Sequence, residues 1–462
     1  MPDRSPRFSL VNLGCPKNTV DSEGILGSLA LDGFRFTPDP MTADICVVNT
    51  CGFLAAAREE AAEVLAELAQ ARGRRGRPRL VATGCAVERE GGEPVLKGFL
   101  EDADARVGFA DYPRLPDICR GLLGLLGARA VRDSSRASTG YAGRDLPAGY
   151  FDFLDRPRMR IGSECSAYLK IGEGCSNCCA YCSIPLIRGR RASRPMKAIL
   201  KEARELVASG AKELNLIAQD TTAYGMDIAG KPQLAALLKE LLKMPEDLWF
   251  RILYAHPKHL TEEILAVMGS DGRVCPYLDL PLQHVNERML KAMGRGYGRR
   301  RVEEILERTR GGRRRMAIRT SFIVGHPGEG EAEFEELLAF VGHGAFDHMG
   351  VFTWSPEPGT VSAKMEGRVD PAVAEERRGR LMQAQADVLE RRARRFRGRN
   401  ATVLIESRTR AGWGGRTVWQ APDVDGATWV QDPQHKARMG TFLAVRIISK
   451  TGYDWQAEPS RP

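Results

Sequence analysis

The sequence predicts an α/β protein in three parts: a parallel sheet at the front, a partial (βα)6 barrel in the middle and a small OB-like β-barrel at the end. Strand-like runs alternate with helix-like runs over 1–145 and again over 165–396, which is the pattern of parallel sheets with helical crossovers. Residues 397–462 hold short strands between Gly, Pro and Asp turns, as in small β-barrels. Residues 146–164 are rich in Pro, Gly, Asp and Arg, and we expect a linker there.

Length and composition agree with this division. At about 150 residues per domain, 462 residues correspond to roughly three domains. Hydrophobic residues make up 43% and charged residues 27%, which excludes a largely disordered chain. No stretch approaches the roughly 20 apolar residues of a membrane span, and the first residues lack the apolar segment of a secretion signal. We therefore expect a cytoplasmic protein.

In the front part, hydrophobic runs of strand length alternate with helical patterns. The expected strands are Phe8–Leu13, Asp44–Asn49 and Leu80–Thr83, and the expected helices are Asp21–Leu31 and Ala55–Ala71. Strands that are joined by helices run parallel, so their C-terminal ends lie along one edge of the sheet.

The middle part shows six strand–helix units, which suggests a partial barrel rather than a full eightfold one. The expected strands are Ala167–Ile171, Glu213–Ala218, Trp249–Tyr254, Tyr277–Leu280, Ile318–Val324 and Met349–Thr353. Helical patterns include Ala198–Ser209, Gln233–Leu242 and Glu331–Phe340, and a long charged helix over 372–396 closes this part. The end part has expected strands at Thr402–Ile405, Thr428–Gln431 and Thr441–Ile448.

The cysteines indicate chemistry rather than cross-linking. There are eleven, an odd number, in a long chain without a secretion signal, so metal or redox chemistry is a better interpretation than a disulfide framework. Cys46 lies inside an expected strand and is assigned to the core. We assign no role to three isolated cysteines, Cys119, Cys165 and Cys275.

The most specific motif is the loop Gly174-Cys175-Ser176-Asn177-Cys178-Cys179-Ala180-Tyr181-Cys182, directly after the first strand of the middle part. Cys175, Cys179 and Cys182 have the spacing C-x3-C-x2-C, and three thiolates hold three irons of a 4Fe-4S cluster while one iron stays open. A structural zinc site, the main alternative, needs a fourth ligand. Cys178 in place of Cys179 gives a second possible frame.

A second group of cysteines is dispersed in the front part. Cys15, Cys51 and Cys85 each follow an expected parallel strand, so they should converge at the edge where open α/β sheets build their sites. Gly14 and Gly84 allow the backbone to approach an inorganic centre closely. The alternative is three unrelated buried cysteines, which are common in α/β cores.

The middle motif resembles that of the radical S-adenosylmethionine (SAM) enzymes. The front segments Leu13-Gly14-Cys15-Pro16-Lys17-Asn18, Asn49-Thr50-Cys51 and Thr83-Gly84-Cys85 resemble the methylthiotransferases of that superfamily. The resemblance implies a Rossmann-like front domain over 1–145, a radical SAM core over 165–396 and a TRAM barrel over 397–462 that recognises the substrate. It favours Cys179 over Cys178.

The resemblance also implies the cofactors and the reaction. Cys175, Cys179 and Cys182 would hold a 4Fe-4S cluster that binds SAM, and Cys15, Cys51 and Cys85 an auxiliary 4Fe-4S cluster that supplies sulfur. SAM would serve as both radical source and methyl donor. No catalytic residue is expected beyond these ligands. Polar strand ends, exemplified by Gln219 and Asp220, would line the SAM pocket.

Two branches of that family differ in substrate. Cys15-Pro16-Lys17-Asn18 resembles the branch that modifies the β-carbon of an aspartate in small-subunit ribosomal protein S-twelve; the branch acting on a tRNA adenosine usually has Gln-Met-Asn there. An acidic pair, Asp423 and Asp425, suits a basic protein partner better than a phosphate backbone. We therefore expect the protein substrate and keep the tRNA substrate as the alternative.

Partners and rival functions complete the expectations. The net charge of +9, with arginine runs at 299–301, 313–315 and within 390–400, is compatible with solvated helix faces or with contact to ribosomal RNA. A flavodoxin or ferredoxin is the expected electron donor, the sulfur donor is unassigned, and a monomer is expected. A non-catalytic iron–sulfur sensor that binds RNA, and a sulfur-inserting enzyme acting on a lipid-like cofactor, are further alternatives; the latter would lack the terminal barrel.

Overall fold

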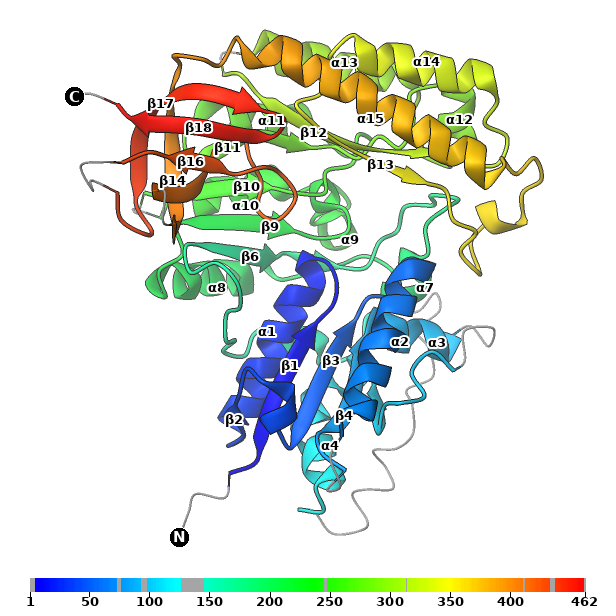
Figure 1. Cartoon of the computed structure of the whole chain (residues 1–462), viewed down its shortest axis with the longest axis vertical. Helices are drawn as coiled ribbons and strands as arrows, with labels where there is room; N and C mark the ends of the chain where they lie inside the picture. Colours follow the sequence, from blue (N-terminus) through cyan, green and yellow to red (C-terminus); the bar gives the residue numbers. More distant parts are fainter. Residues whose placement is uncertain are drawn as a thin grey trace.

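The computed structural model has three parts, and Figure 1 shows the front part below the middle part, with the C-terminal barrel at the side of the latter. The α/β class and the terminal β-barrel are confirmed. The structure describes residues 5–72, 76–92, 98–125, 145–244, 247–312, 314–409, 412–432 and 437–460. Among these residues, no helix is both long and apolar enough to cross a membrane.

The front sheet is parallel and has the strand order β2-β1-β3-β4-β5. Its three long strands agree with the prediction to within a residue or two, whereas the two short edge strands were not predicted. The strands are β1 (Arg7–Asn12), β2 (Arg35–Phe36), β3 (Ile45–Thr50), β4 (Arg79–Gly84) and β5 (Ala105–Val107). β3 is buried along its whole length, as expected for a central strand covered on both faces.

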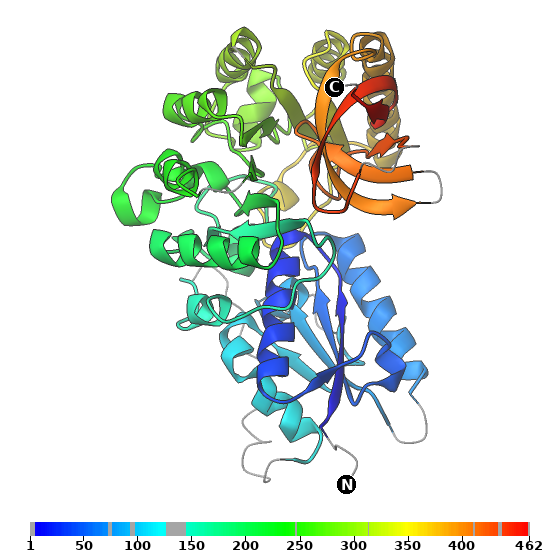
Figure 2. The ribbon, with the colours of Figure 1, turned by 90° about the vertical axis from the view of Figure 1, so that its left-hand side faces the viewer.

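Helices cover both faces of the front sheet (Figure 2). The side chains of α1 (Pro16–Leu31) pack with one face, and those of α2 (Ala55–Gln70) pack with the other. α1 begins at Pro16, five residues before the predicted start, because proline is suited to the first turn of a helix. Three further helical segments follow: α3 (Cys85–Gly92), η3 (Phe109–Arg114) and α4 (Leu115–Leu122).

The expected linker contains a buried helix. α6 (Tyr150–Leu154) places the rings of Tyr150 and Phe153 in the core of the front part, where neither is exposed. Phe109 and Tyr112 of η3 contact these rings at centroid distances of 5.0 to 6.2 Å. The segment 146–164 is therefore more than a linker, and the domain boundaries themselves stay predictions.

The middle part is a six-stranded, fully parallel sheet with the order β13-β12-β11-β10-β9-β6. All six strands overlap predicted ones, because most are short, largely buried apolar runs bounded by turns. They are β6 (Ser166–Lys170), β9 (Glu213–Ile217), β10 (Trp249–Ile252), β11 (Val274–Asp279), β12 (Ala317–Val324) and β13 (His348–Thr353). A two-stranded ribbon, β7 (Gly172–Glu173) and β8 (Ala192–Ser193), was not predicted.

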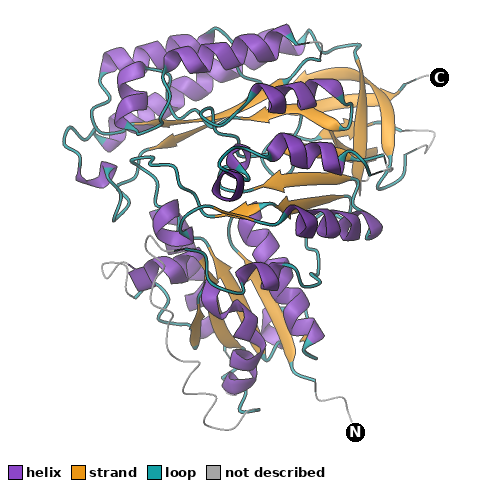
Figure 3. Cartoon of the chain, turned by 180° about the vertical axis from the view of Figure 1, so that it is seen from behind, coloured by secondary structure: helices purple, strands orange, loops and turns teal. Residues whose placement is uncertain are grey.

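Helices of the middle part lie along the outer side of this sheet (Figure 3). Their apolar faces form one large core cluster with the strands. The longer ones are α8 (Met196–Ala208), α10 (Leu234–Leu241), α11 (Glu262–Ser270), α13 (Arg299–Gly311), α14 (Glu331–Gly342) and α15 (Pro371–Ala393). The shorter ones are α7 (Ile184–Arg188), α9 (Met226–Ala229) and α12 (Glu287–Ala292).

The C-terminal part is a closed five-stranded barrel with the order β14-β15-β16-β18-β17. The strands are β14 (Asn400–Thr409), β15 (Gly412–Thr417), β16 (Thr428–Val430), β17 (Phe442–Thr451) and β18 (Asp454–Pro459). The prediction missed β15 and β18. β15 is glycine-rich because the strands pack very closely: a Cβ on Gly415 would lie 2.1 Å from the carbonyl oxygen of Leu404.

The C-terminal barrel is fastened to the middle sheet by buried ion pairs. Arg416 contacts Glu213 at the start of β9, and Arg251 of β10 donates to Glu213 over 2.8 Å. Asp425 accepts a hydrogen bond of 2.7 Å from the hydroxyl of Tyr277 and lies 3.1 Å from the His348 ring. The acidic pair predicted to face a partner is therefore divided, because the Asp425 side chain is buried in this internal contact and only Asp423 is exposed.

Candidate functional site

The three dispersed cysteines lie at one edge of the front sheet. β1, β3 and β4 are neighbours, with Asn12 opposite Asn49 and Thr50 opposite Gly84. Cys15 follows the end of β1, Cys51 directly follows β3 and Cys85 directly follows β4. This edge faces the middle part of the molecule (Figure 1). We call Cys15, Cys51 and Cys85 the front triad.

Close backbone packing holds the front triad. Asn18 donates from Nδ2 to the carbonyl of Thr50 over 2.8 Å, and its Oδ1 lies 3.6 Å from the Cys85 sulfur. A Cβ on Gly52 would lie 2.5 Å from the carbonyl carbon of Cys85. Gly84 has φ +93°, and a Cβ there would meet Asn49 Oδ1 at 2.2 Å. The glycines are therefore required by the approach of the three chain segments.

The thiols of the front triad affect one another. Burial raises the pKa of Cys85 to about 12, with Arg188 opposing it and the neighbouring Cys51 and Cys15 adding to the rise. Burial also raises the pKa of Cys51. At Cys15 burial acts in the same direction, but Lys17 and Arg188 outweigh it and the pKa is lowered. The three sulfurs thus share one electrostatic environment.

One arginine of the middle part reaches the front triad. Arg188, at the end of α7, donates from Nε to the Cys85 sulfur over 3.2 Å, and from Nη2 to Asn18 over 2.6 Å. It also pairs with Asp21 of α1 at 3.0 Å and with Glu173 at 2.7 Å. Each of its three nitrogens therefore has an acceptor in or beside the junction between the two parts.

The contacts of Arg188 belong to a buried network of balanced charge. Lys170 bonds to Asp21 and lies 2.9 Å from Glu173, so two cations face two carboxylates. The Tyr150 hydroxyl lies 2.7 Å from both carboxylates and can donate its single proton to either of them. Arg188 and Lys170 hold the pKa of Glu173 below its usual range against the effect of burial. Breaking such a network by removing one partner is costly, on the order of 3–5 kcal/mol.

The second cysteine group lies on the loop after β7. We call Cys175, Cys179 and Cys182 the barrel triad. The amide of Cys175 donates to Gly189 O over 3.1 Å, and the amide of Ala180 donates to Met293 O over 2.9 Å. A Cβ on Gly294, which has φ +65°, would lie 2.5 Å from the carbonyl oxygen of Cys178. The loop is thus held by backbone contacts on both sides.

A buried arginine also contacts the barrel triad. Arg295 donates from Nη1 to the Cys179 sulfur over 3.2 Å and to the Tyr181 hydroxyl over 2.9 Å. Its remaining bonds go to the Tyr297 hydroxyl and the Pro281 carbonyl. Burial raises the pKa of Cys175 to about 11 and that of Cys182 further, with the neighbouring Cys179 adding to the rise in both.

The two candidate frames of the loop differ in their surroundings. Cys178 is exposed, whereas Cys179 is partly buried and receives the Arg295 bond. All described cysteines are free thiols. The donor set fits an iron–sulfur cluster at each triad, since thiolates are the ligands that such clusters use. The sequence analysis did not identify Arg188 or Arg295 as residues of the site. The one available signal concerned Arg188, a charged residue at the end of the apolar run Ile184–Ile187.

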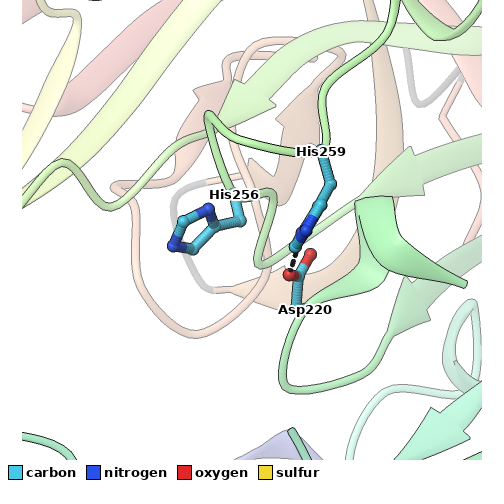
Figure 4. Close-up of side chains that lie close together, drawn as sticks. All are labelled: Asp220, His256 and His259. Carbon is cyan, nitrogen blue, oxygen red and sulfur yellow. Dashed lines mark hydrogen bonds and ion pairs between the residues drawn. The ribbon is translucent and has the colours of Figure 1, made fainter. Parts of the chain in front are cut away.

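Asp220 lies beside two histidines and is bonded to one of them, His259 (Figure 4). It accepts a hydrogen bond from Asn177 of the loop over 2.7 Å and contacts His259 Nδ1 at 2.7 Å. These bonds keep the pKa of Asp220 at about 2, although burial acts to raise it. Asp220, His256 and His259 lie close enough for a metal, but the carboxylate also accepts from Thr222 over 2.8 Å. We interpret this cluster as a support for the loop.

The fold and the two triads define the class of the protein. A parallel half-barrel that carries a three-cysteine loop after its first strand is the arrangement of a radical SAM enzyme, and residues 169–341 match the radical SAM superfamily. Residues 7–105 match an uncharacterized protein family (UPF0004), and 398–459 match the TRAM domain. Enzymes of this class use an iron–sulfur cluster and SAM.

The chain belongs to the ribosomal protein uS12 methylthiotransferase (RimO) family. It is 41% identical to the member from Geotalea uraniireducens, over 97% of both chains. It is 40% identical to that from Geobacter sulfurreducens, over 98% of both. Among solved structures, the fold is similar to the radical SAM methyltransferase TsrM from Kitasatospora setae, with a TM-score of 0.52 and 14% identity, covering 76% of this chain and 75% of that one.

Proposed function

We propose that this chain adds a methylthio group to the β-carbon of an aspartate in small-subunit ribosomal protein uS12. The family membership supports the reaction and the substrate protein. The observation that carries the proposal is Arg188: it lies six residues after Cys182 of the barrel triad and donates to Cys85 of the front triad. The two triads therefore belong to one site at the junction of two domains.

The two triads are proposed to hold two 4Fe-4S clusters. Cys175, Cys179 and Cys182 would bind the cluster that carries SAM, and Cys15, Cys51 and Cys85 the auxiliary one. When bound, these groups supply a carbon-centred radical and the sulfur, which is chemistry that no side chain of this chain provides. The support lies in the donor sets, and the glycines Gly52, Gly84 and Gly294 let the chain segments that carry these cysteines pack closely.

The residues of the chain position and shield this chemistry. Arg188 and Arg295 each donate an N–H to one cysteine sulfur, which stabilises negative charge there. The buried aromatic rings of Phe109, Tyr112 and Tyr150 belong to the same core cluster as Cys85 and exclude water from that side of the front triad. The balanced network of Lys170 and Glu173 keeps the two domains in register without leaving a net charge.

Partners and location belong to the same proposal. We expect a cytoplasmic monomer that is reduced by a flavodoxin or a ferredoxin; the sulfur donor stays unassigned. The arginine run at 299–301 gives little support for contact with ribosomal RNA, because its side chains are engaged within the protein. Arg299 and Arg300 are paired with Glu303 and Glu304 on the helix face, and Arg301 donates to backbone carbonyls. Arg313 lies outside the described residues.

Mass analysis of uS12 peptides tests the proposal. Cells with and without this protein should differ in the mass of the aspartate-containing tryptic peptide, and the anaerobically reconstituted enzyme should hold about eight irons per chain, four for each cluster. A uS12 peptide that is unchanged, together with a modified tRNA adenosine, would transfer the proposal to the tRNA branch. About four irons per chain would contradict the two-cluster assignment.

A further inference from the structure

A buried lysine lies beside the front triad without an ionic partner. Lys17 is the second residue of α1 and is 8% exposed. Within the described residues its ammonium makes no ion pair or hydrogen bond, and it lies 3.1 Å from the ring centroid of Tyr254. Burying a cation without a countercharge is expensive, so this arrangement needs an explanation.

The neighbouring carboxylates are already committed. Asp279 pairs with Arg319 at 3.2 Å and accepts the backbone N–H of Tyr254 over 2.8 Å. Asp21 and Glu173 are engaged in the balanced network described above. Lys17 therefore has no carboxylate of its own among the described residues, and its nearest anionic neighbour is the sulfur of Cys15, two residues away.

The surroundings of Lys17 are prepared for an anion. The first turn of α1 holds no acidic residue, and its N-cap, Cys15, makes no side-chain capping bond, so the positive end of the helix adds to the lysine charge. Tyr254, whose ring lies under the ammonium, has the strained φ of +61° just after β10. Such backbone strain is held where surrounding structure requires it and is found most often at functional sites.

We propose that Lys17 binds the side-chain carboxylate of the substrate aspartate; this inference rests on the proposed function. The β-carbon of aspartate is bonded directly to its carboxylate carbon. A cation that holds the carboxylate two residues from Cys15 therefore places the reacting carbon beside the front triad.

Lys450 shows that a missing ion pair alone does not make a binding site. It is also a buried lysine over aromatic rings, with its ammonium 5.1 Å from the Phe396 centroid and 5.3 Å from that of Trp455. It lies in the C-terminal barrel, on β17, and away from both triads. Lys450→Met is therefore the matched control, since it removes a similar buried ammonium elsewhere.

Equilibrium binding of uS12 peptides to the reconstituted enzyme tests the proposal. Two peptides are compared without reductant: the natural aspartate peptide and one with asparagine at that position. We expect the wild-type enzyme to prefer aspartate by about ten- to hundredfold, the range of a hydrogen bond between charged groups. Lys17→Met should reduce this ratio to near one, Lys17→Arg should keep most of it, and Lys450→Met should leave it unchanged.

Two results would overturn the inference. One is a Lys17→Met enzyme that still prefers aspartate as strongly as wild type. The other is a loss of front-cluster iron, or a changed electron paramagnetic resonance signal of that cluster, in Lys17→Met but not in Lys450→Met, which would make Lys17 a countercharge for the cluster. Failure of the proposed function is recognised separately, because the reduced wild-type enzyme would then leave the aspartate peptide unmodified.

Discussion

The front triad and the barrel triad achieve similar surroundings by different routes. The barrel triad lies on a single loop, Cys175 to Cys182, whereas the front triad collects Cys15, Cys51 and Cys85 from three strand ends. Each has one buried arginine with an N–H 3.2 Å from one sulfur. The arginine of the barrel triad comes from its own domain, but that of the front triad comes from the neighbouring domain. The front site is therefore complete only when the two domains are packed together.

The two arginines also differ in their charge balance. Arg188 faces Asp21 and Glu173, so its charge is neutralised within the network. Arg295 has no carboxylate partner among the described residues, and its bonds go to hydroxyls, a carbonyl and Cys179. The arginine beside the barrel triad thus has no carboxylate to balance it, whereas the arginine beside the front triad is neutralised, and the unpaired cation near the front triad is Lys17.

Removing one ligand from each triad should separate their tasks and have the largest effects. Cys175→Ala should abolish reductive cleavage of SAM, because the SAM-binding cluster loses a ligand. Cys51→Ala should retain cleavage and stop sulfur insertion. The measurements are 5′-deoxyadenosine release and the mass of the uS12 peptide. Thiolated product from Cys51→Ala would contradict the assignment of two clusters.

Arg188→Met should destabilise the junction of the two domains. It leaves Asp21 and Glu173 with one cation, Lys170, in a buried place, which we expect to cost about 3–5 kcal/mol in the free energy of unfolding. Urea unfolding monitors the stability, and iron analysis should show loss at the front triad. The exposed Arg300, 92% accessible in its side chain, provides the control Arg300→Met, which should change stability by less than about 0.5 kcal/mol. An equal loss in both variants would show that Arg188 has no special role.

A buried acid of the front domain should make its stability fall with pH. Burial raises the pKa of Glu88 to about 7, so the folded chain keeps a proton that the unfolded chain releases above pH 4.5. Stability from this group is present below pH 4.5 and is lost as the pH rises to about 7. Glu88→Gln should therefore be more stable than wild type by about 1–3 kcal/mol at pH 8, with no gain at pH 4. Urea unfolding at both pH values tests this.

Glu213 should contribute to stability with the opposite pH dependence, because two arginines hold the pKa of its carboxyl group at about 2. The comparison with Glu88 shows that burial raises the pKa of an acid where it outweighs nearby donors, and that directly paired arginines reverse the shift. If the difference between Glu88→Gln and wild type did not depend on pH, Glu88 would be charged in the folded protein.

Arg295→Gln should give the smallest effect, a shift in the potential of the SAM-binding cluster. A reduced cluster carries more negative charge, so loss of the uncompensated cation should lower its midpoint potential, on the order of 50 mV. Redox titration followed by electron paramagnetic resonance measures the shift. Arg295→Lys keeps the charge and should restore most of the potential, whereas an unchanged potential in Arg295→Gln would limit Arg295 to a packing role.

Local patterns in the sequence predicted most of the fold. The three long front strands and all six strands of the middle sheet were recognised, because buried strands are short apolar runs between turns. The missed elements depend on tertiary contacts. α6 is a short helix in a polar segment that is stabilised by burial of Tyr150 and Phe153, and β15 is rich in glycine because the neighbouring strand leaves no space for side chains.

The sequence by itself determined the order of strands and helices and the candidate ligands, since spacing along one loop and position after a strand are local properties. Only the tertiary structure decided what surrounds those ligands. Arg188 lies more than 100 residues from Cys85 in the chain. Among the described residues no carboxylate is bonded to Lys17, because its neighbours Asp279 and Glu173 are already paired with arginines. Side chains from distant segments meet only after the domains pack, so their pairing and charge balance are not encoded in any local pattern.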